Sequence, residues 1–213
     1  MARLVCLANS ERPGGQCIAG IDVDTGQWIR PVPRDADALR ISRCIIGGKL
    51  LEPLHIFQLE LDRPKEIPRF QRENRLIKNW NWSIIGRHFK AELLDYCDET
   101  SPILHSASDR VSPADLEKLP PERWQSLQLV RARRLKCEHD PRNPIRWRAH
   151  FQDRDGNEYS LPITDGAIRG RLQCGDRFGG ECLLTVSLTK PWLAPNSSQA
   201  EWCYKVVAAV IEL

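Results

Sequence analysis

The chain of 213 residues contains no apolar run that approaches the roughly 20 residues a helix needs to cross a bilayer. It also contains no CxxC pair among its 8 cysteines, and several of these, such as Cys6 and Cys182, stand inside apolar runs where a thiol packs as a small hydrophobic group. The first residues, Met1 to Val5, lead directly into a strand-like run without the pattern of a signal peptide. These absences predict free thiols, no membrane partner and a reducing, cytoplasmic location.

The sequence also lacks the short motifs that mark common active sites, including a phosphate-binding glycine loop, HExxH, GxSxG and a paired-carboxylate motif. Cys137 and His139, with Cys174 and Cys182, are soft metal ligands, but their spacing matches no zinc motif. We therefore expect no metal site and no cofactor, and we favour a binding module over an enzyme. An enzyme stays open as an alternative, because many active sites are assembled from residues far apart in the chain.

Apolar residues make up 41% of the chain and charged residues 28%, as in ordinary globular proteins. The 15 prolines and 13 glycines separate strand-like runs, which favours short strands and turns over long helices. The net charge of +3 is too small to indicate a polyanionic partner by itself. The arginines cluster locally, however, and the candidate sites depend on these clusters.

Alternation of apolar and polar residues with period two predicts strands in both halves of the chain. In the first half, Trp28, Arg30 and Val32 share one strand face, and residues 55–62 alternate cleanly. Further strands are expected at residues 4–8, 17–23, 127–137, 146–152, 159–163, 182–189 and 202–211. The chain is therefore predicted to be rich in β-structure.

The middle of the chain has a different pattern. Residues 73–96 carry apolar side chains at helical spacing, which predicts one or two helices there. Ser112 and Pro113 provide an N-cap and a first helical position, so a further short helix is expected to begin at this point.

Two stretches of the first half recur in the second half in the same order. Residues 57–64 align without gaps on residues 184–191, with the apolar positions, a basic residue and a closing proline in register. Residues 28–32 parallel residues 159–163, with a glycine upstream and an aspartate downstream in both cases. Any two amphipathic strands look alike, but two matches in the same order indicate an internal duplication.

The sequence thus predicts an all-β dominated fold with minor α content, made of two OB-like small Greek-key barrels joined by a helical segment. We expect the first barrel at residues 1–72, the helical connecting segment at residues 73–122 and the second barrel at residues 123–213.

The opening of the chain, with residues 5–10, Cys17-Ile18-Ala19-Gly20 and Trp28-Ile29-Arg30-Pro31-Val32, resembles the dual OB-containing domain, a family of prokaryotic proteins. Residues 159–165 and 203–209 are also similar to this family, so the resemblance spans nearly the whole chain. The resemblance implies two OB-like barrels and a role in binding nucleic acid, within a prokaryotic defence or conflict system. It implies no catalytic residue.

Trp28, Arg30 and Arg34 form a candidate nucleic-acid site in the first barrel. Single-stranded nucleic acid is held by aromatic faces that stack on bases and by cations that contact phosphates. A tryptophan and an arginine on one strand face supply both groups. In the alternative interpretation, Trp28 packs inside the barrel and Arg30 pairs with an acidic neighbour.

The densest basic run of the sequence comprises Arg131, Arg133, Arg134 and Lys136. By strand alternation, the first two side chains would face one way and the last two the other. Arginines on one strand face could follow a phosphate backbone, and Arg148 and His150 on the next strand would widen the nucleic-acid-binding surface. The alternative is a solvated edge strand whose charges prevent aggregation.

Thr164 and Asp165 end a strand of the second half, and Asp35 ends the matching strand of the first half. A carboxylate in these places could orient a basic residue, bind a metal or cap a helix. Capping is favoured, because Asp165 precedes a plausible first helical turn. If the chain were a small enzyme acting on a nucleotide or a modified base, these three residues would be its candidates. A protein–protein adaptor would explain the modest net charge equally well.

Overall fold

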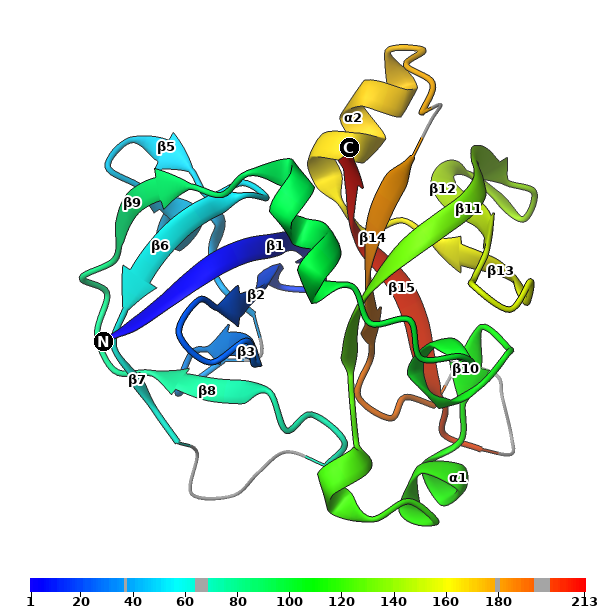
Figure 1. Ribbon diagram of the computed structural model, residues 1–213, viewed down its shortest axis with the longest axis horizontal. Coiled ribbons are helices and arrows are strands. Elements are labelled where there is room, and N and C mark those ends of the chain that lie inside the picture. Colours follow the sequence, from blue (N-terminus) through cyan, green and yellow to red (C-terminus); the bar gives the residue numbers. More distant parts are fainter. Residues whose placement is uncertain (37, 64–68, 179–180, 194–199) are drawn as a thin grey trace. The chain divides into compact units, whose positions relative to one another are not determined.

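The computed structural model covers residues 1–213 and describes all of them except residues 37, 64–68, 179–180 and 194–199. The chain divides into two compact units (Figure 1). The first unit comprises Met1–Pro68 and Glu73–Tyr96, and the second comprises Arg69–Arg72 and Cys97–Leu213. The predicted connecting segment, residues 73–122, is divided between the two units.

The first unit consists almost entirely of short strands. They are β1 (Ala2–Arg12), β2 (Gly15–Asp22), β3 (Trp28–Val32), β4 (Ile45–Ile46), β5 (Lys49–Leu50), β6 (His55–Leu59), β7 (Leu61–Asp62), β8 (Asn74–Ile77) and β9 (Ser83–Arg87). Two 3-10 helices, η1 (Ile41–Cys44) and η2 (Lys90–Tyr96), accompany them. Strands β4 and β5 form a small separate hairpin.

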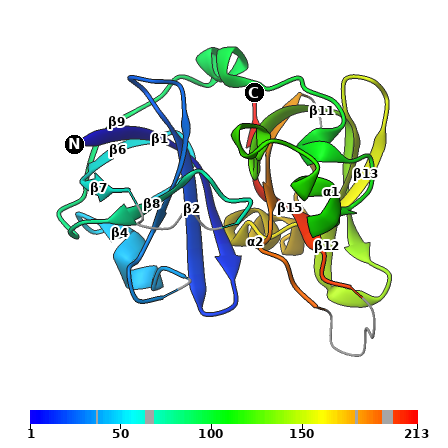
Figure 2. The same cartoon turned by 90° about the horizontal axis from the view of Figure 1, so that it is seen from below.

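The other strands of this unit form one sheet in the order β7-β8-β3-β2-β1-β6-β9. Strand β6 lies next to one edge of the sheet and leads almost directly into β7, which forms the other edge. The two edges are therefore close together, and the sheet curls into a barrel. Strands β1 and β2 lie side by side as a long curved hairpin (Figure 2). Strand β3 pairs with β8 in parallel. Buried apolar side chains from several strands, including Leu4, Ile18, Ile29 and Phe57, fill the interior.

The second unit contains longer strands and two short α-helices. Its strands are β10 (Arg110–Val111), β11 (Leu127–Asp140), β12 (Asn143–Gln152), β13 (Glu158–Pro162), β14 (Cys182–Leu188) and β15 (Cys203–Glu212). Its helices are η3 (Ile103–His105), α1 (Pro113–Glu117), η4 (Pro121–Arg123) and α2 (Gly166–Gln173). Among the described residues, no helix is both long and apolar enough to span a membrane.

The strand order of the second unit is β10-β15-β14-β11-β12-β13. The barrel closes where Ile163 forms a parallel bridge with Val207, and the Thr164 backbone N–H donates to the Val207 carbonyl at 2.9 Å. Helix α2 lies at the end of the barrel where β14 begins and β15 ends (Figure 1). The core includes Val130 and Phe151, both nearly inaccessible to solvent.

The two units share one topology. In each, the first strand (β1 or β11) pairs with both the second (β2 or β12) and the fourth (β6 or β14), and the third strand is joined in parallel to the fifth. The stretches that repeat in the sequence are the third and fourth strands of these barrels. The connection between the third and fourth strands differs: it holds η1 and the β4–β5 hairpin in the first unit and α2 in the second. The predicted fold class, two OB-like barrels with minor helix, is confirmed.

The helices predicted at residues 73–96 are wrong for most of this stretch, and only its end, Lys90–Tyr96, is helical. The structure has β8 and β9 there, followed by the 3-10 helix η2. Leu76 and Ile77 belong to β8, and Ile84 and Ile85 belong to β9, so their helical spacing is a coincidence. Periodicity alone cannot separate helix from strand in such short runs. The predicted start at Ser112 is confirmed, since its side chain accepts a hydrogen bond from the Asp115 backbone at 3.0 Å and caps α1.

Candidate functional site

The basic run of β11 contains a β-bulge. Arg134 has a positive φ of 54°, and the pairing with β12 shifts there, so that Arg133 lies opposite Gln152 and Lys136 lies opposite His150. Arg134 and Leu135 of β11 thus lie together opposite the single residue Phe151 of β12. The bulge reverses the alternation, and Arg131, Arg133 and Lys136 are all exposed, as is Arg134 itself. Gln152 and His150 lie on one face of β12, so the expectation that Lys136 faces away from Arg133 is wrong.

Residues directly opposite each other in an antiparallel pair have side chains on the same face. His150 and Arg148 of β12 therefore lie on the same face as Lys136 and Glu138 of β11, to which they are paired. We call the exposed cations of β11 together with these two residues the cationic face. It comprises Arg131, Arg133, Arg134, Lys136, Arg148 and His150.

Half of the cationic face is held by partners within the second unit. Arg131 forms an ion pair with Glu181. Arg148 lies 3.3 Å from Asp140 and donates to the Ser160 hydroxyl at 2.9 Å, and its side chain is only 20% exposed. His150 Nε2 lies 3.9 Å from a Glu138 oxygen, which makes this a weak contact on a partly exposed surface.

The other half has no such partners. Within the part of the chain that the structure describes, the side chains of Arg133, Arg134 and Lys136 form no hydrogen bond and no ion pair, and all three residues are exposed. Three neighbouring cations without acidic partners repel one another, and only an anionic ligand or solvent ions can neutralise them. These three residues therefore carry the positive charge of the cationic face that no described acidic side chain balances.

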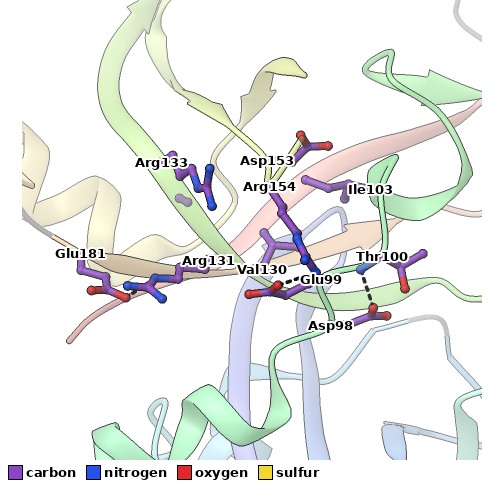
Figure 3. Close-up of a pocket in the computed structure, with 11 residues that line it drawn as sticks. Asp98, Glu99, Thr100, Ile103, Val130, Arg131, Arg133, Asp153, Arg154 and Glu181 are labelled. Atoms are coloured by element: carbon purple, nitrogen blue, oxygen red, sulfur yellow. Dashed lines mark hydrogen bonds and ion pairs between the residues drawn. The ribbon is translucent and has the colours of Figure 1, made fainter. Parts of the chain in front are cut away.

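A pocket of about 400 Å³ lies beside β11, where this strand leaves β14 and joins β12. Figure 3 shows Arg131 directed at Glu181 and Arg154 at Glu99, whereas Arg133 stands apart with no dashed line to it. The lining of the pocket thus includes two ion pairs, and also Arg133, which forms none with a described residue.

Two carboxylates of the pocket, Asp98 and Asp153, are fully engaged in hydrogen bonds. Burial alone would raise the pKa of Asp98, but hydrogen bonds from Gln125 and Thr100 outweigh it, and the pKa is lowered. The same balance lowers the pKa of Asp153, which accepts from Ser101 and Asn157. Both groups are ionised at neutral pH and serve the local structure, so neither is suited to donate a proton to a substrate.

The candidate residues of the first barrel are placed less favourably for a ligand. Ile29 faces the core, and Arg30 is also buried: it is only 2% exposed and donates to the Asn74 side-chain oxygen at 2.9 Å. Arg34 is exposed and forms an ion pair with Asp62, and Trp28 is half-buried. These three residues do not present a set of exposed, unpaired groups.

The polar residues at the strand ends also have structural roles. Asp165 is 5% exposed and caps α2, accepting from the Ile168 backbone at 3.1 Å, as the favoured interpretation predicts. Burial raises its pKa. The Thr164 hydroxyl donates to the Val207 carbonyl at 3.2 Å, and Asp35 is exposed. None of the three lines the pocket beside β11.

The described residues bring no three His, Cys, Asp or Glu side chains together in a way that could hold a metal ion. Burial raises the pKa of the Cys44, Cys97 and Cys137 thiols to about 11, and Cys203 has the same value for the same reason. Thiols with such pKa values are almost fully protonated at neutral pH and are poor nucleophiles.

Sequence reasoning missed one group of surface side chains in the second unit, Trp192, Trp202, Tyr204 and Arg110. The signal was weak, because the two tryptophans lie on either side of a connection between strands and only the fold pairs them. The sequence does place a tryptophan at each end of this connection, and this was the one available sign of the group.

Each unit is thus a small closed barrel of the OB type, and the chain is a double OB-fold protein. The chain belongs to the dual OB-containing domain family, whose sequence profile matches residues 2–210. A search of curated proteins finds no match to it.

Proposed function

We propose that this protein binds nucleic acid through the cationic face of its second barrel. The observation that carries the proposal is the group of three exposed cations at the β11 bulge, Arg133, Arg134 and Lys136, which have no acidic partner among the described residues. Lys and Arg side chains that neutralise phosphates release counterions, and this release supplies most of the non-specific affinity for nucleic acid.

The position of these cations on the barrel supports the proposal. OB-folds bind oligonucleotides on the face of their second and third strands and on the loops next to it. In the second unit these strands are β12 and β13, and the cationic face extends from β12 onto β11. Two further exposed arginines lie nearby: Arg142 in the turn between β11 and β12, and Arg146 within the first half of β12.

The backbone at Arg134 gives a second line of support. A non-glycine residue with positive φ is strained, and glycine is the usual residue at such a bulge. An arginine side chain that forms no hydrogen bond or ion pair with a described residue adds little to stability there, so its cation is more simply explained by a ligand.

The variant Arg134→Gly tests this argument. Because glycine adopts a positive φ without strain, we expect the free energy of unfolding to stay the same or to rise by about 0.5–1 kcal/mol, measured by urea denaturation. The same variant should bind an oligonucleotide less tightly. A variant that is clearly less stable than the parent would show that Arg134 has a structural role.

Binding itself is tested by fluorescence anisotropy with a labelled single strand of about 20 nucleotides at low salt. We expect Arg133→Ala and Lys136→Ala each to weaken binding by about 3- to 10-fold, because each removes one phosphate contact. Arg177→Ala is the matched control, since Arg177 is also exposed in the second unit but lies outside the cationic face. The proposal fails if the parent protein does not bind at micromolar concentration, or if the control loses as much affinity as the two variants.

A further inference from the structure

A surface aromatic cluster lies at the beginning of β15, beside β10 and the residues that follow β14. Trp192 is 51% exposed, and its backbone is bridged to that of Trp202 by two hydrogen bonds of 3.0 Å. The Trp192 ring packs edge-on against Tyr204, with ring centroids 5.8 Å apart. The bridge fixes the backbone at both tryptophans, and the Trp192 ring is held against the Tyr204 ring.

A cation lies over this surface. The Arg110 guanidinium is 4.7 Å from the centroid of the Trp202 ring and 6.0 Å from that of Tyr204, within the range of a cation–π interaction. Arg110 is exposed, and its guanidinium forms no hydrogen bond and no ion pair with another described residue. We call Arg110, Trp192, Trp202 and Tyr204 the aromatic cluster.

The aromatic cluster stands on the outside of the second barrel. Cys203 and Lys205 are fully buried, so Tyr204 between them points outward. Strand β15 joins β13 at the Val207–Ile163 bridge, and β13 pairs with β12. The outer wall that carries the cationic face therefore continues around the barrel through β13 to β15.

We propose that the aromatic cluster stacks an unpaired nucleobase, so that the second barrel prefers single-stranded nucleic acid to a duplex. The inference rests on the proposed function and specifies its ligand. Every base has a flat π-face that stacks on an aromatic side chain, and a paired base inside a duplex does not offer that face. Arg110 supplies positive charge beside the stacked base, where the phosphate of the same nucleotide would lie.

Three ligands of about 20 nucleotides separate base stacking from charge: a single-stranded oligothymidylate, a duplex, and a strand of the same length without bases. Trp192→Ala should weaken binding of oligothymidylate by about 5- to 100-fold and leave the affinity for the baseless strand unchanged. Trp192→Phe should retain most of the affinity, because phenylalanine also offers an aromatic face.

Trp80→Ala is the matched control. Trp80 is 39% exposed and has the Arg43 guanidinium 4.6 Å from its ring centroid, but it belongs to the first unit, so no loss of affinity is expected. The inference is overturned if Trp192→Ala binds oligothymidylate as the parent does, or if the parent binds the duplex or the baseless strand equally well. Either result leaves the proposed function standing, whereas a parent that binds none of the three ligands removes both.

Discussion

Replacing Arg133, Arg134 and Lys136 together with glutamate is expected to lower the affinity for single-stranded nucleic acid by about 100-fold or more at low salt. The variant loses three phosphate contacts and gains three charges that repel phosphate. For single strands, each lost contact removes about 0.7 from the slope of the logarithm of the association constant against the logarithm of salt concentration, so the slope should become shallower by about 2. Anisotropy titrations at several salt concentrations measure both quantities.

A charge swap provides the control for this triple variant. Arg131 and Glu181 form an ion pair, and exchanging the two residues keeps both the pair and the net charge of the protein. We expect the swapped protein to lose far less affinity than the triple variant. Since the three substituted side chains are exposed, the urea midpoint should change little in the triple variant. Equal affinity of the triple variant and the parent would contradict the assignment of the cationic face.

The second large effect concerns Lys205, which is fully buried in the second barrel. Its ammonium donates to the Ser106 carbonyl, to the Ser106 hydroxyl at 2.9 Å and to the Ser108 carbonyl at 2.8 Å, and it lies 5.3 Å from the centroid of the Tyr159 ring. Burial lowers the pKa of Lys205 to about 7, against the opposing charges of Asp109 and Asp153. The lysine thus joins the segment before β10 to the core strand β15.

The free energy of unfolding should therefore rise with pH above about 7. In this range the unfolded chain, whose lysine keeps its ordinary pKa of 10.5, binds more protons than the folded protein, and stability increases wherever the unfolded state binds more protons. The slope for one proton is at most about 1.4 kcal/mol per pH unit, so we expect a gain of about 1–2 kcal/mol between about pH 7 and 8.5.

Urea denaturation of the parent and of Lys205→Met across this range measures the effect. The methionine variant should lack the rise, whatever its absolute stability, because the titrating group is gone. Lys118→Met is the control, since Lys118 is exposed and pairs with Asp115 on the surface. The measurements end at about pH 8.5 because the buried thiols act in the opposite direction at higher pH. Their raised pKa values make the free energy of unfolding fall with pH from about 9 upward. Parallel curves for the parent and Lys205→Met would contradict the account of Lys205.

The two-barrel architecture could be predicted from the sequence because the same strand pattern occurs in both halves of the chain. The match of residues 57–64 with 184–191, and of residues 28–32 with 159–163, places the third and fourth strands of both barrels. Strand alternation also predicted the strands at residues 159–163 and 182–189, which are β13 (Glu158–Pro162) and β14 (Cys182–Leu188). The same rule places Lys205 on the inner face with Cys203 and Val207, so its burial could have been predicted from period two alone.

The candidate site was less predictable, because it depends on backbone details that side-chain patterns do not carry. No glycine or asparagine marks the bulge at Arg134, and without the bulge the cations of β11 would divide between two faces. Arg30 shares its strand face with Trp28 as expected, but only the fold reveals that this guanidinium is buried against Asn74. Trp192 and Trp202 are joined by a backbone bridge between two residues ten positions apart, which a side-chain pattern does not predict.

The proposed function places nucleic acid on the outer wall of the second barrel. Ultraviolet cross-linking of an oligonucleotide that carries iodouracil, followed by mass spectrometry of the peptides, tests it most directly. The account predicts cross-linked peptides from β11 and β12 and from the stretch that contains Trp192 and Trp202. Cross-links confined to the first unit, or their absence under conditions of saturating oligonucleotide, would contradict it.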